Sequence, residues 1–180
     1  MSEHSIVVEP ATPAAIAPFG CFIGAEPTVP RFAEWPGVTV YGPSPITIGS
    51  GGEILHVQMR AMQFPARVRL LERHFHHTQT YLPANGRPFV MVLGSECAGD
   101  LPNVQKLRAF LFSDGAGIAM SAGTWHEFPL ALQDDTRFTV ILREESHINR
   151  VERPAFPNDA SGPDLERWDI AARSTVWVRM

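Results

Sequence analysis

Short runs of apolar residues, alternating with polar ones and separated by turn residues, dominate the hydrophobic pattern of this 180-residue chain. Each run has the length of a strand, is rich in β-branched or aromatic residues, and is bounded by Gly, Pro, Asn or Asp. The segments that follow this pattern are 38–41, 54–59, 68–73, 78–82, 89–93, 109–112 and 137–142. Many short strands at near-regular spacing predict an all-β protein, a sandwich or a barrel.

Helical patterns are few. Residues 12–17 predict one short helix, with Thr12 as the N-cap and Pro13 at the first helical position. Towards the C-terminus, residues 154–162 are rich in Pro, Asp and Gly, which predicts a surface excursion. Residues 174–178 then predict an edge strand.

Length and composition favour one globular domain over residues 1–180, with a core over about 10–149 and a C-terminal extension over 150–180. Hydrophobic residues make up 44% of the chain and charged residues 19%, which is typical of a folded protein. The 15 basic and 19 acidic residues give a net charge of −4. Because nucleic-acid binding requires a concentrated basic face, we expect no nucleic-acid partner.

The N-terminus and the cysteines favour a cytoplasmic protein. Residues 1–10 lack the apolar centre of a signal peptide, and no apolar run approaches the roughly 20 residues that span a bilayer. Cys21 and Cys97 match no metal-ligand spacing, and a secreted disulfide scaffold normally has more cysteines. We therefore expect no membrane partner.

The densest group of polar residues lies between Glu72 and Gln79. Residues two apart on a strand share a face, so Glu72 and His74 project together. A turn through His76 and His77 then brings Gln79 back on a neighbouring strand, and we interpret these two histidines as solvent-facing turn residues. The pattern places a carboxylate, an imidazole and an amide around one point.

A second motif, Gly115-x5-Ser121-x-Gly123-x2-His126, resembles the second cupin motif, G-x5-P-x-G-x2-H, with Ser121 in place of proline. It follows the polar group at the distance expected in a cupin, and adds a second imidazole, that of His126.

The polar group itself fits the end of the first cupin motif. The spacing His74-x4-Gln79-x6-Gly86 is that of the motif, with Gln79 in place of the acid and Glu72 in place of the earlier histidine. Two motifs in the right order predict a cupin-type jelly-roll β-barrel whose interior holds the ligands.

One family joins these motifs. The runs Leu71-Glu-Arg-His74, Gln79-x-Tyr81-Leu-Pro83, Lys106-Leu-Arg-Ala-Phe110 and Trp125-His126-x-x-Pro129-Leu130 resemble the ureidoglycolate lyases of allantoin breakdown. The resemblance covers about residues 10–145. It implies a homodimeric cupin that splits ureidoglycolate, a small 2-hydroxy acid, into glyoxylate and urea. It also implies a divalent metal such as nickel, with zinc or manganese as alternatives.

The resemblance and the motifs together give the candidate site. The candidate metal ligands are Glu72, His74, Gln79 and His126, and the candidate catalytic groups are His126, His74 and Glu72. The candidate substrate-binding residues are Gln79, Arg108 and Tyr81. Arg108 lies in an apolar strand and either binds an acid or points outward to a partner, whereas Tyr81 is more typical of a barrel core.

Departures from the family keep two other functions open. Glu127 stands where the family usually has a second consecutive histidine. Phe75, His76 and His77 follow His74, where the family commonly has Pro and a small turn. One alternative is another cupin lyase, hydrolase or isomerase acting on a different small hydroxy or keto acid. The other is a non-catalytic cupin that binds a small ligand as a sensor.

Overall fold

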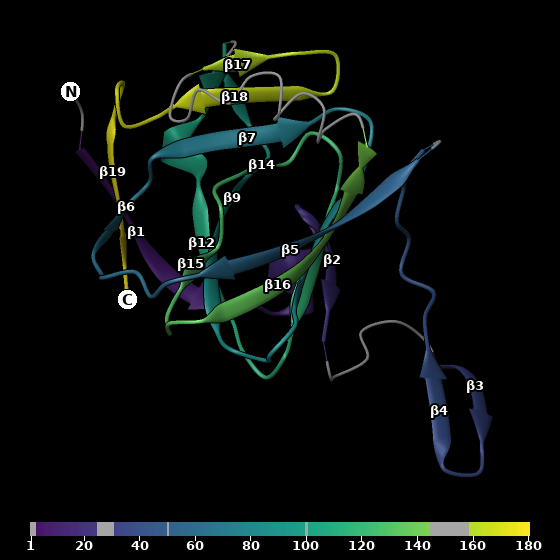
Figure 1. Ribbon diagram of the computed structural model, residues 1–180. Helices are drawn as coiled ribbons and strands as arrows, with labels where there is room; N and C mark the ends of the chain where they lie inside the picture. The colour runs from purple at the N-terminus through teal and green to yellow at the C-terminus, as the bar shows by residue number, and fades with distance from the viewer. Residues whose placement is uncertain (1–2, 25–30, 50, 100, 145–158) are drawn as a thin grey trace.

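The computed structural model describes residues 3–24, 31–49, 51–99, 101–144 and 159–180, and these are almost entirely β-structure (Figure 1). The sheets curl around an apolar interior, which confirms the predicted cupin-type β-barrel. The described elements are β1 (Glu3–Pro10), α1 (Pro13–Ile16), β2 (Gly20–Ile23), β3 (Arg31–Trp35), β4 (Val38–Tyr41), β5 (Gly52–Met59), β6 (Ala66–Arg67), β7 (Leu70–His74), β8 (Gln79–Pro83), β9 (Phe89–Gly94), β10 (Cys97–Ala98), β11 (Leu101–Pro102), η1 (Val104–Lys106), β12 (Arg108–Phe112), β13 (Gly117–Met120), β14 (Trp125–His126), β15 (Leu130–Ala131), β16 (Thr136–Arg143), β17 (Ala160–Ser161), β18 (Leu165–Asp169) and β19 (Thr175–Arg179).

Two sheets build the body of the molecule. The large sheet has the order β17-β18-β7-β14-β9-β12-β1-β19-β6, with β15 paired to β9, and the smaller sheet has the order β2-β13-β8-β16-β5. The remaining pairs are β10-β11 and the hairpin β3-β4, which extends away from the barrel (Figure 1). Strands from both ends of the chain therefore lie in the large sheet.

The large sheet buries a separate core on each of its faces. On β9, Phe89, Met91 and Leu93 pack into the core shared with the smaller sheet, which includes Tyr81 and Phe138. The alternate residues of β9 pack into a second core around Trp125. Because both faces are covered, β9 is apolar along its whole length and fully buried.

The predicted helix is confirmed at α1. It begins after Thr12, whose Oγ1 accepts a hydrogen bond from the N–H of Ala15 at 3.2 Å, and Pro13 occupies the first turn. The prediction of an edge strand at 174–178 is wrong. The strand β19 pairs parallel with β1 on one side and antiparallel with β6 on the other, so it lies inside the large sheet.

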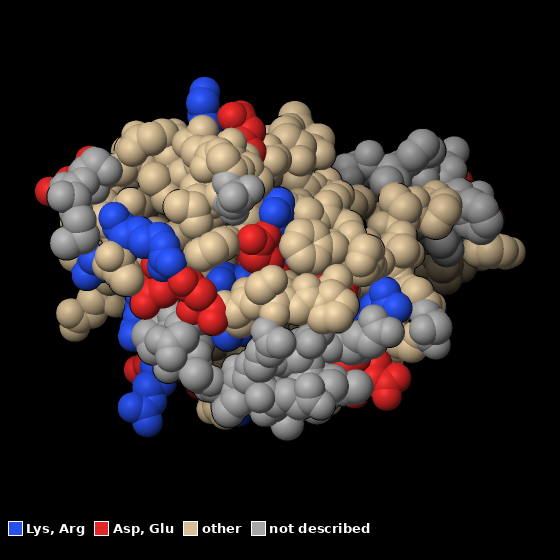
Figure 2. All heavy atoms as spheres, turned by 90° about the horizontal axis from the view of Figure 1, so that it is seen from above, with Lys and Arg blue, Asp and Glu red and all other residues tan. Residues whose placement is uncertain are grey.

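The outer surface carries charges of both signs. Figure 2, a view onto the top of the barrel as drawn in Figure 1, shows Lys and Arg side chains interspersed with Asp and Glu. This face has no extended patch of a single sign. No helix in the described ranges is both long and apolar enough to cross a membrane.

Candidate functional site

Three strands of the large sheet bring charged and imidazole side chains into one row. In the strand register, Glu72 on β7 lies opposite His126 on β14 and, on its other side, opposite Arg167 on β18. Cross-strand partners project to the same face of a sheet, and His74, two residues along β7, shares that face. The row is therefore Arg167, Glu72 and His126, with His74 beside it.

The carboxylate of Glu72 lies at the centre of this group. Its Oε1 is 3.5 Å from His126 Nε2 and 4.0 Å from His74 Nε2. The three residues each offer one ligand atom within 4.8 Å of the other two, and all three are at most 3% exposed. One carboxylate oxygen and two imidazole nitrogens that converge in this way form a donor set for a divalent cation.

The orientation of His126 leaves its Nε2 for the site. Its Nδ1 lies 3.1 Å from the carbonyl oxygen of Thr124. Because a carbonyl can only accept, Nδ1 carries a proton in this contact, and in the neutral imidazole Nε2 then carries the lone pair. The Nε2 atom is buried and makes no hydrogen bond with the described residues.

Gln79 comes from the smaller sheet. It pairs with Met120 across β8 and β13, and shares the inward face of β8 with Tyr81, which lies in the barrel core. The side chain is buried, and neither its amide oxygen nor its amide nitrogen makes a hydrogen bond with a described residue. A buried amide without partners is costly, so this group is suited to binding a ligand.

The turn before β14 explains why the second cupin motif places His126 here. Gly123 has a φ of +84°, which favours glycine, and its N–H donates to the carbonyl oxygen of His74 at 2.6 Å. The turn is thus tied directly to the end of β7. Ser121 donates its N–H to the carbonyl oxygen of Phe19 at 2.9 Å, a bond that the usual proline could not make.

His77 belongs to the buried site, so its interpretation as a solvent-facing residue is wrong, whereas His76 is exposed as expected. His77 Nδ1 lies 2.9 Å from Asp164 Oδ2, and the His77 ring lies 4.5 Å from the ring of His74. His74, His77 and Asp164 form a second group of potential metal ligands within 4.8 Å of one another. The turn is drawn inward because Asp164, through its other oxygen, accepts the N–H of His76.

Burial controls the charge of His77. Desolvation lowers the pKa of its imidazole from 6.5, and this outweighs the opposite effect of the Asp164 carboxylate. The positive charge of Arg143 acts in the same direction as desolvation. His77 is therefore neutral at neutral pH.

Arg167 makes an ion pair with Glu72 inside the site. Its Nε and Nη2 atoms lie 3.2 Å and 3.1 Å from Glu72 Oε2, and the two side chains are 7% and 1% exposed. The carboxylate thus has one oxygen towards the guanidinium and the other towards the imidazoles. Removing one partner of a buried pair typically costs roughly 3–5 kcal/mol, so each of these residues depends on the other.

Glu127 lies beside the site and joins two strands. Its carboxylate accepts the N–H groups of Arg69 and Leu70, at the start of β7, and that of Phe128. Desolvation raises the pKa of Glu127 to about 7, although the three N–H groups favour the charged form. This buried carboxylate therefore connects the end of β14 to the start of β7.

The other two candidate residues make contacts outside the row. Tyr81 is buried in the barrel core, with an edge-to-face contact to Phe138. Arg108 forms two hydrogen bonds of 2.7 Å with the carboxylate of Glu9, and lies over the ring of Phe110. Their roles in substrate binding stay predictions.

No sequence motif indicated Asp164 or Arg167 as site residues. Both lie outside the two motifs, in the C-terminal residues that the sequence predicts as an extension. Only the pairing of β18 with β7, over a separation of more than ninety residues, brings them to Glu72 and His74. Such a register is not encoded in a local pattern.

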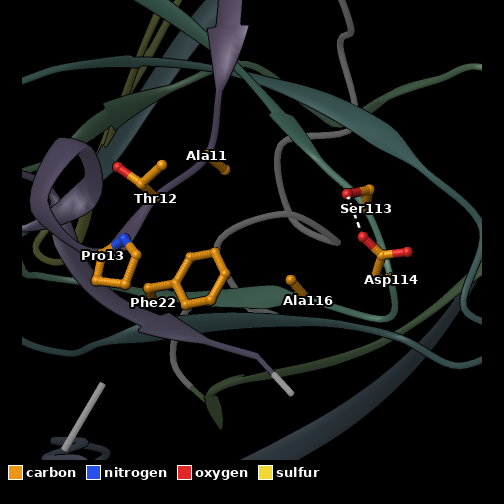
Figure 3. Close-up of a pocket in the computed structure, with 7 residues that line it drawn as sticks. All are labelled: Ala11, Thr12, Pro13, Phe22, Ser113, Asp114 and Ala116. Carbon is orange, nitrogen blue, oxygen red and sulfur yellow. Dashed lines mark hydrogen bonds between the residues drawn. The ribbon is translucent and has the colours of Figure 1, made fainter. Parts of the chain in front are cut away.

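A pocket of about 380 Å³ lies elsewhere, where β1 ends and β12 turns into β13 (Figure 3). It is lined by Ala11, Thr12, Pro13, Phe22, Ser113, Asp114 and Ala116. Ser113 and Asp114 are hydrogen-bonded to each other at 2.8 Å. Five residues along the chain separate Arg108, in register with His126 through Leu93, from Ser113 at the pocket, about 17 Å along a strand, so this pocket is not part of the site.

Comparison with known proteins agrees with the motifs. The family model described as ureidoglycolate lyase matches residues 3–161. A ureidoglycolate lyase of Azotobacter vinelandii is 34% identical over 151 residues, which cover 79% of this chain and 87% of the relative. Ureidoglycolate lyases of Brucella anthropi and Burkholderia mallei are 30% and 33% identical, over 84% and 77% of this chain and 90% and 82% of the relatives.

Proposed function

The chain belongs to the ureidoglycolate lyase family, and on that premise we propose that it cleaves ureidoglycolate to glyoxylate and urea with a bound divalent metal. The observation that carries this proposal is the buried group of Glu72, His74 and His126, formed where the two cupin motifs meet. A homodimer, a place in allantoin breakdown and a cytoplasmic location stay predictions.

The chemistry of the substrate defines what the site must supply. One carbon of ureidoglycolate bears a hydroxyl group, a carboxylate and the ureido nitrogen. Its collapse to glyoxylate requires a base for the hydroxyl proton, an acid for the leaving nitrogen and a positive charge near the carboxylate. An imidazole near neutrality suits both proton transfers.

The residues of the site fit a divalent cation. Glu72 supplies an anionic oxygen, and His74 and His126 supply imidazole nitrogens. The amide of Gln79 is buried and has no hydrogen-bond partner among the described residues, so it suits a fourth ligand or a substrate contact. This set favours nickel, zinc or manganese over magnesium. When bound, such an ion acts as a Lewis acid and lowers the pKa of a hydroxyl group.

Proton transfer is then assigned to the imidazoles by their surroundings. The contact with Thr124 holds the proton of His126 on Nδ1 and directs Nε2 into the site, as a ligand or, without an ion, as a base. His77 stands outside the Glu72 group, beside His74, and is neutral at neutral pH. Asp164 holds its Nδ1, so His77 is placed to relay a proton at the edge of the site.

Glyoxylate release from ureidoglycolate by the metal-loaded protein tests the proposal. The parent should exceed the spontaneous rate, and His126→Gln should lower turnover by roughly 10² or more, because it removes a positioned imidazole. His56→Gln, at an exposed position on β5, is the matched control and should retain the activity of the parent. A parent that binds a small hydroxy acid but releases no glyoxylate would favour the sensor instead.

A further inference from the structure

A buried arginine faces the site from the C-terminal part of the chain. Arg167 lies on β18 directly opposite Glu72, beyond the last residue that the family model matches. Its polar contacts within the described part of the chain are both to a single atom, Glu72 Oε2. The residue is 6% exposed.

This arrangement leaves part of the guanidinium for another acceptor. A guanidinium has five N–H groups in a rigid plane, and the contacts of Nε and Nη2 to one oxygen use only the hydrogens on one edge. The remaining edge has the spacing of a carboxylate, which it can bind through two parallel hydrogen bonds. The Arg167 side chain is only 7% exposed, so this edge has little access to water and favours a second anionic partner.

The charges of the site lead to the same conclusion. Glu72 and Arg167 together carry no net charge, and a guanidinium on a ligand carboxylate opposes the binding of a divalent cation. An anionic ligand that binds together with the cation removes this disadvantage. The pair therefore suits a site that takes a metal ion and a carboxylic acid at the same time.

We propose that Arg167 binds the carboxylate of the substrate, while Glu72 Oε2 holds the guanidinium in the orientation required. The proposal rests on the assignment of a small 2-hydroxy acid as substrate. It makes Arg167 the residue that distinguishes acids from the corresponding neutral amides. Arg108, by contrast, already has both oxygens of Glu9 as partners and is 40% exposed.

A structural role for Arg167 is the rival explanation. In that case the arginine only holds the Glu72 carboxylate in position for the metal, and its loss should misplace that ligand and weaken metal binding and acid binding together. The chain offers a matched control for this effect. Next to the Glu72–Arg167 pair, the register pairs Arg73 with Glu166, the same two strands with the charges reversed and a contact of 2.7 Å.

The test compares Arg167→Met, Arg167→Lys and the control Arg73→Met, each loaded with nickel. Binding of glycolate and of its neutral amide, glycolamide, is measured by calorimetry, together with the metal content. The parent should prefer glycolate. Both Arg167 variants should retain metal and lose roughly ten- to a hundredfold in glycolate affinity, with glycolamide unchanged, as expected for a lost charge-assisted pair. Arg167→Lys keeps the positive charge on Glu72 and so guards against misfolding of the methionine variant.

Two results would overturn the proposal. Unchanged glycolate affinity in Arg167→Lys and Arg167→Met would remove Arg167 from carboxylate binding, and Arg108→Met would then show whether that arginine takes its place. Loss of metal in step with loss of glycolate would establish the structural role. If the parent shows no lyase activity but binds glycolate more tightly than both Arg167 variants, only the proposed function is contradicted.

Discussion

Two imidazoles of the site, those of His126 and His77, are each oriented by a contact of Nδ1. His126 donates Nδ1–H to a carbonyl oxygen, that of Thr124, whereas His77 Nδ1 lies against a carboxylate, that of Asp164. Partners of this kind are typical of histidines that bind metals or transfer protons, because they fix the tautomer and the plane of the ring. The two histidines nevertheless belong to different groups, since only His126 converges with Glu72.

Metal binding should separate the two histidines. His126→Ala removes one of the three candidate ligand atoms, the imidazole nitrogen that lies near Glu72 Oε1. It should lower metal affinity by at least roughly tenfold. His77→Ala should retain the metal of the parent. Elemental analysis after dialysis, with affinities from competition with a chelator, gives both values. Equal metal retention by His126→Ala and the parent would remove His126 from the ligand set.

Glu127 should make the stability of the metal-free protein depend on pH. Because its pKa is about 7 in the folded protein and 4.5 ordinarily, the folded state holds the proton more firmly than the unfolded chain. Its contribution to stability is therefore complete below about pH 4.5 and is lost as the pH rises through about 7. This loss is on the order of 3 kcal/mol at most.

Glu127→Gln should flatten this dependence, since an amide does not titrate. The free energy of unfolding, measured with denaturant between about pH 5 and about pH 8, should fall less in the variant than in the parent. Glu96→Gln, at an exposed position, serves as the control and should follow the parent. Identical pH dependence in Glu127→Gln and the parent would show that the carboxylate does not retain its proton on folding.

At the scale of elements, local patterns predicted the strands well. Alternation and turn residues predicted β4, β5, β7, β8, β9, β12 and β16 to within a few residues, because these features act between near neighbours. They did not predict β1 or β18. The strand β1 pairs with β19 from the other end of the chain, and β18 pairs with β7, so their partners lie far away in the sequence.

The same distinction applies to the site. Glu72, His74 and His126 come together as the spacing of two motifs predicted, because a strand fixes which residues share a face. The inward position of His77 depends on Asp164, and that of Arg167 depends on the register of β18. Neither follows from a local pattern.

The turn between β13 and β14 should not tolerate the proline that is usual in the second cupin motif. Ser121→Pro removes the N–H that bonds to Phe19 and should lower the free energy of unfolding by about 1–2 kcal/mol. Ser121→Ala keeps this N–H and, at an exposed position, should cost less than about 0.5 kcal/mol. Denaturant unfolding of both variants measures the difference. A proline variant as stable as the alanine variant would show that the bond contributes nothing.

At the scale of the whole molecule, strands from the two ends of the chain lie side by side within the large sheet. The strand β1 lies between β12 and β19, and β19 lies between β1 and β6, which leads directly into β7. The second core, with Trp125 at its centre, is enclosed by strands from both ends. Residues 165–179 therefore contribute to the same sheet as the site, whereas the sequence predicted a core over about 10–149 with an extension.

Deletion of residues 159–180 should therefore prevent folding rather than trim the surface. It removes Val176 and Val178, both fully buried in the second core, and unpairs the N–H and C=O groups of β1 that face β19 and those of β7 that face β18. Each of these valines contributes roughly 1.5–3 kcal/mol by burial alone, which is large beside a typical total stability of about 5–15 kcal/mol. Deletion of Met180 alone, which is 61% exposed, is the control and should leave the unfolding transition unchanged. In the long deletion, circular dichroism should show that cooperative thermal unfolding is lost. Size-exclusion chromatography should show that the protein aggregates. A chain of residues 1–158 that unfolds cooperatively and retains metal would instead establish residues 10–149 as an independent core, with β18 and β19 added to a barrel that is stable without them.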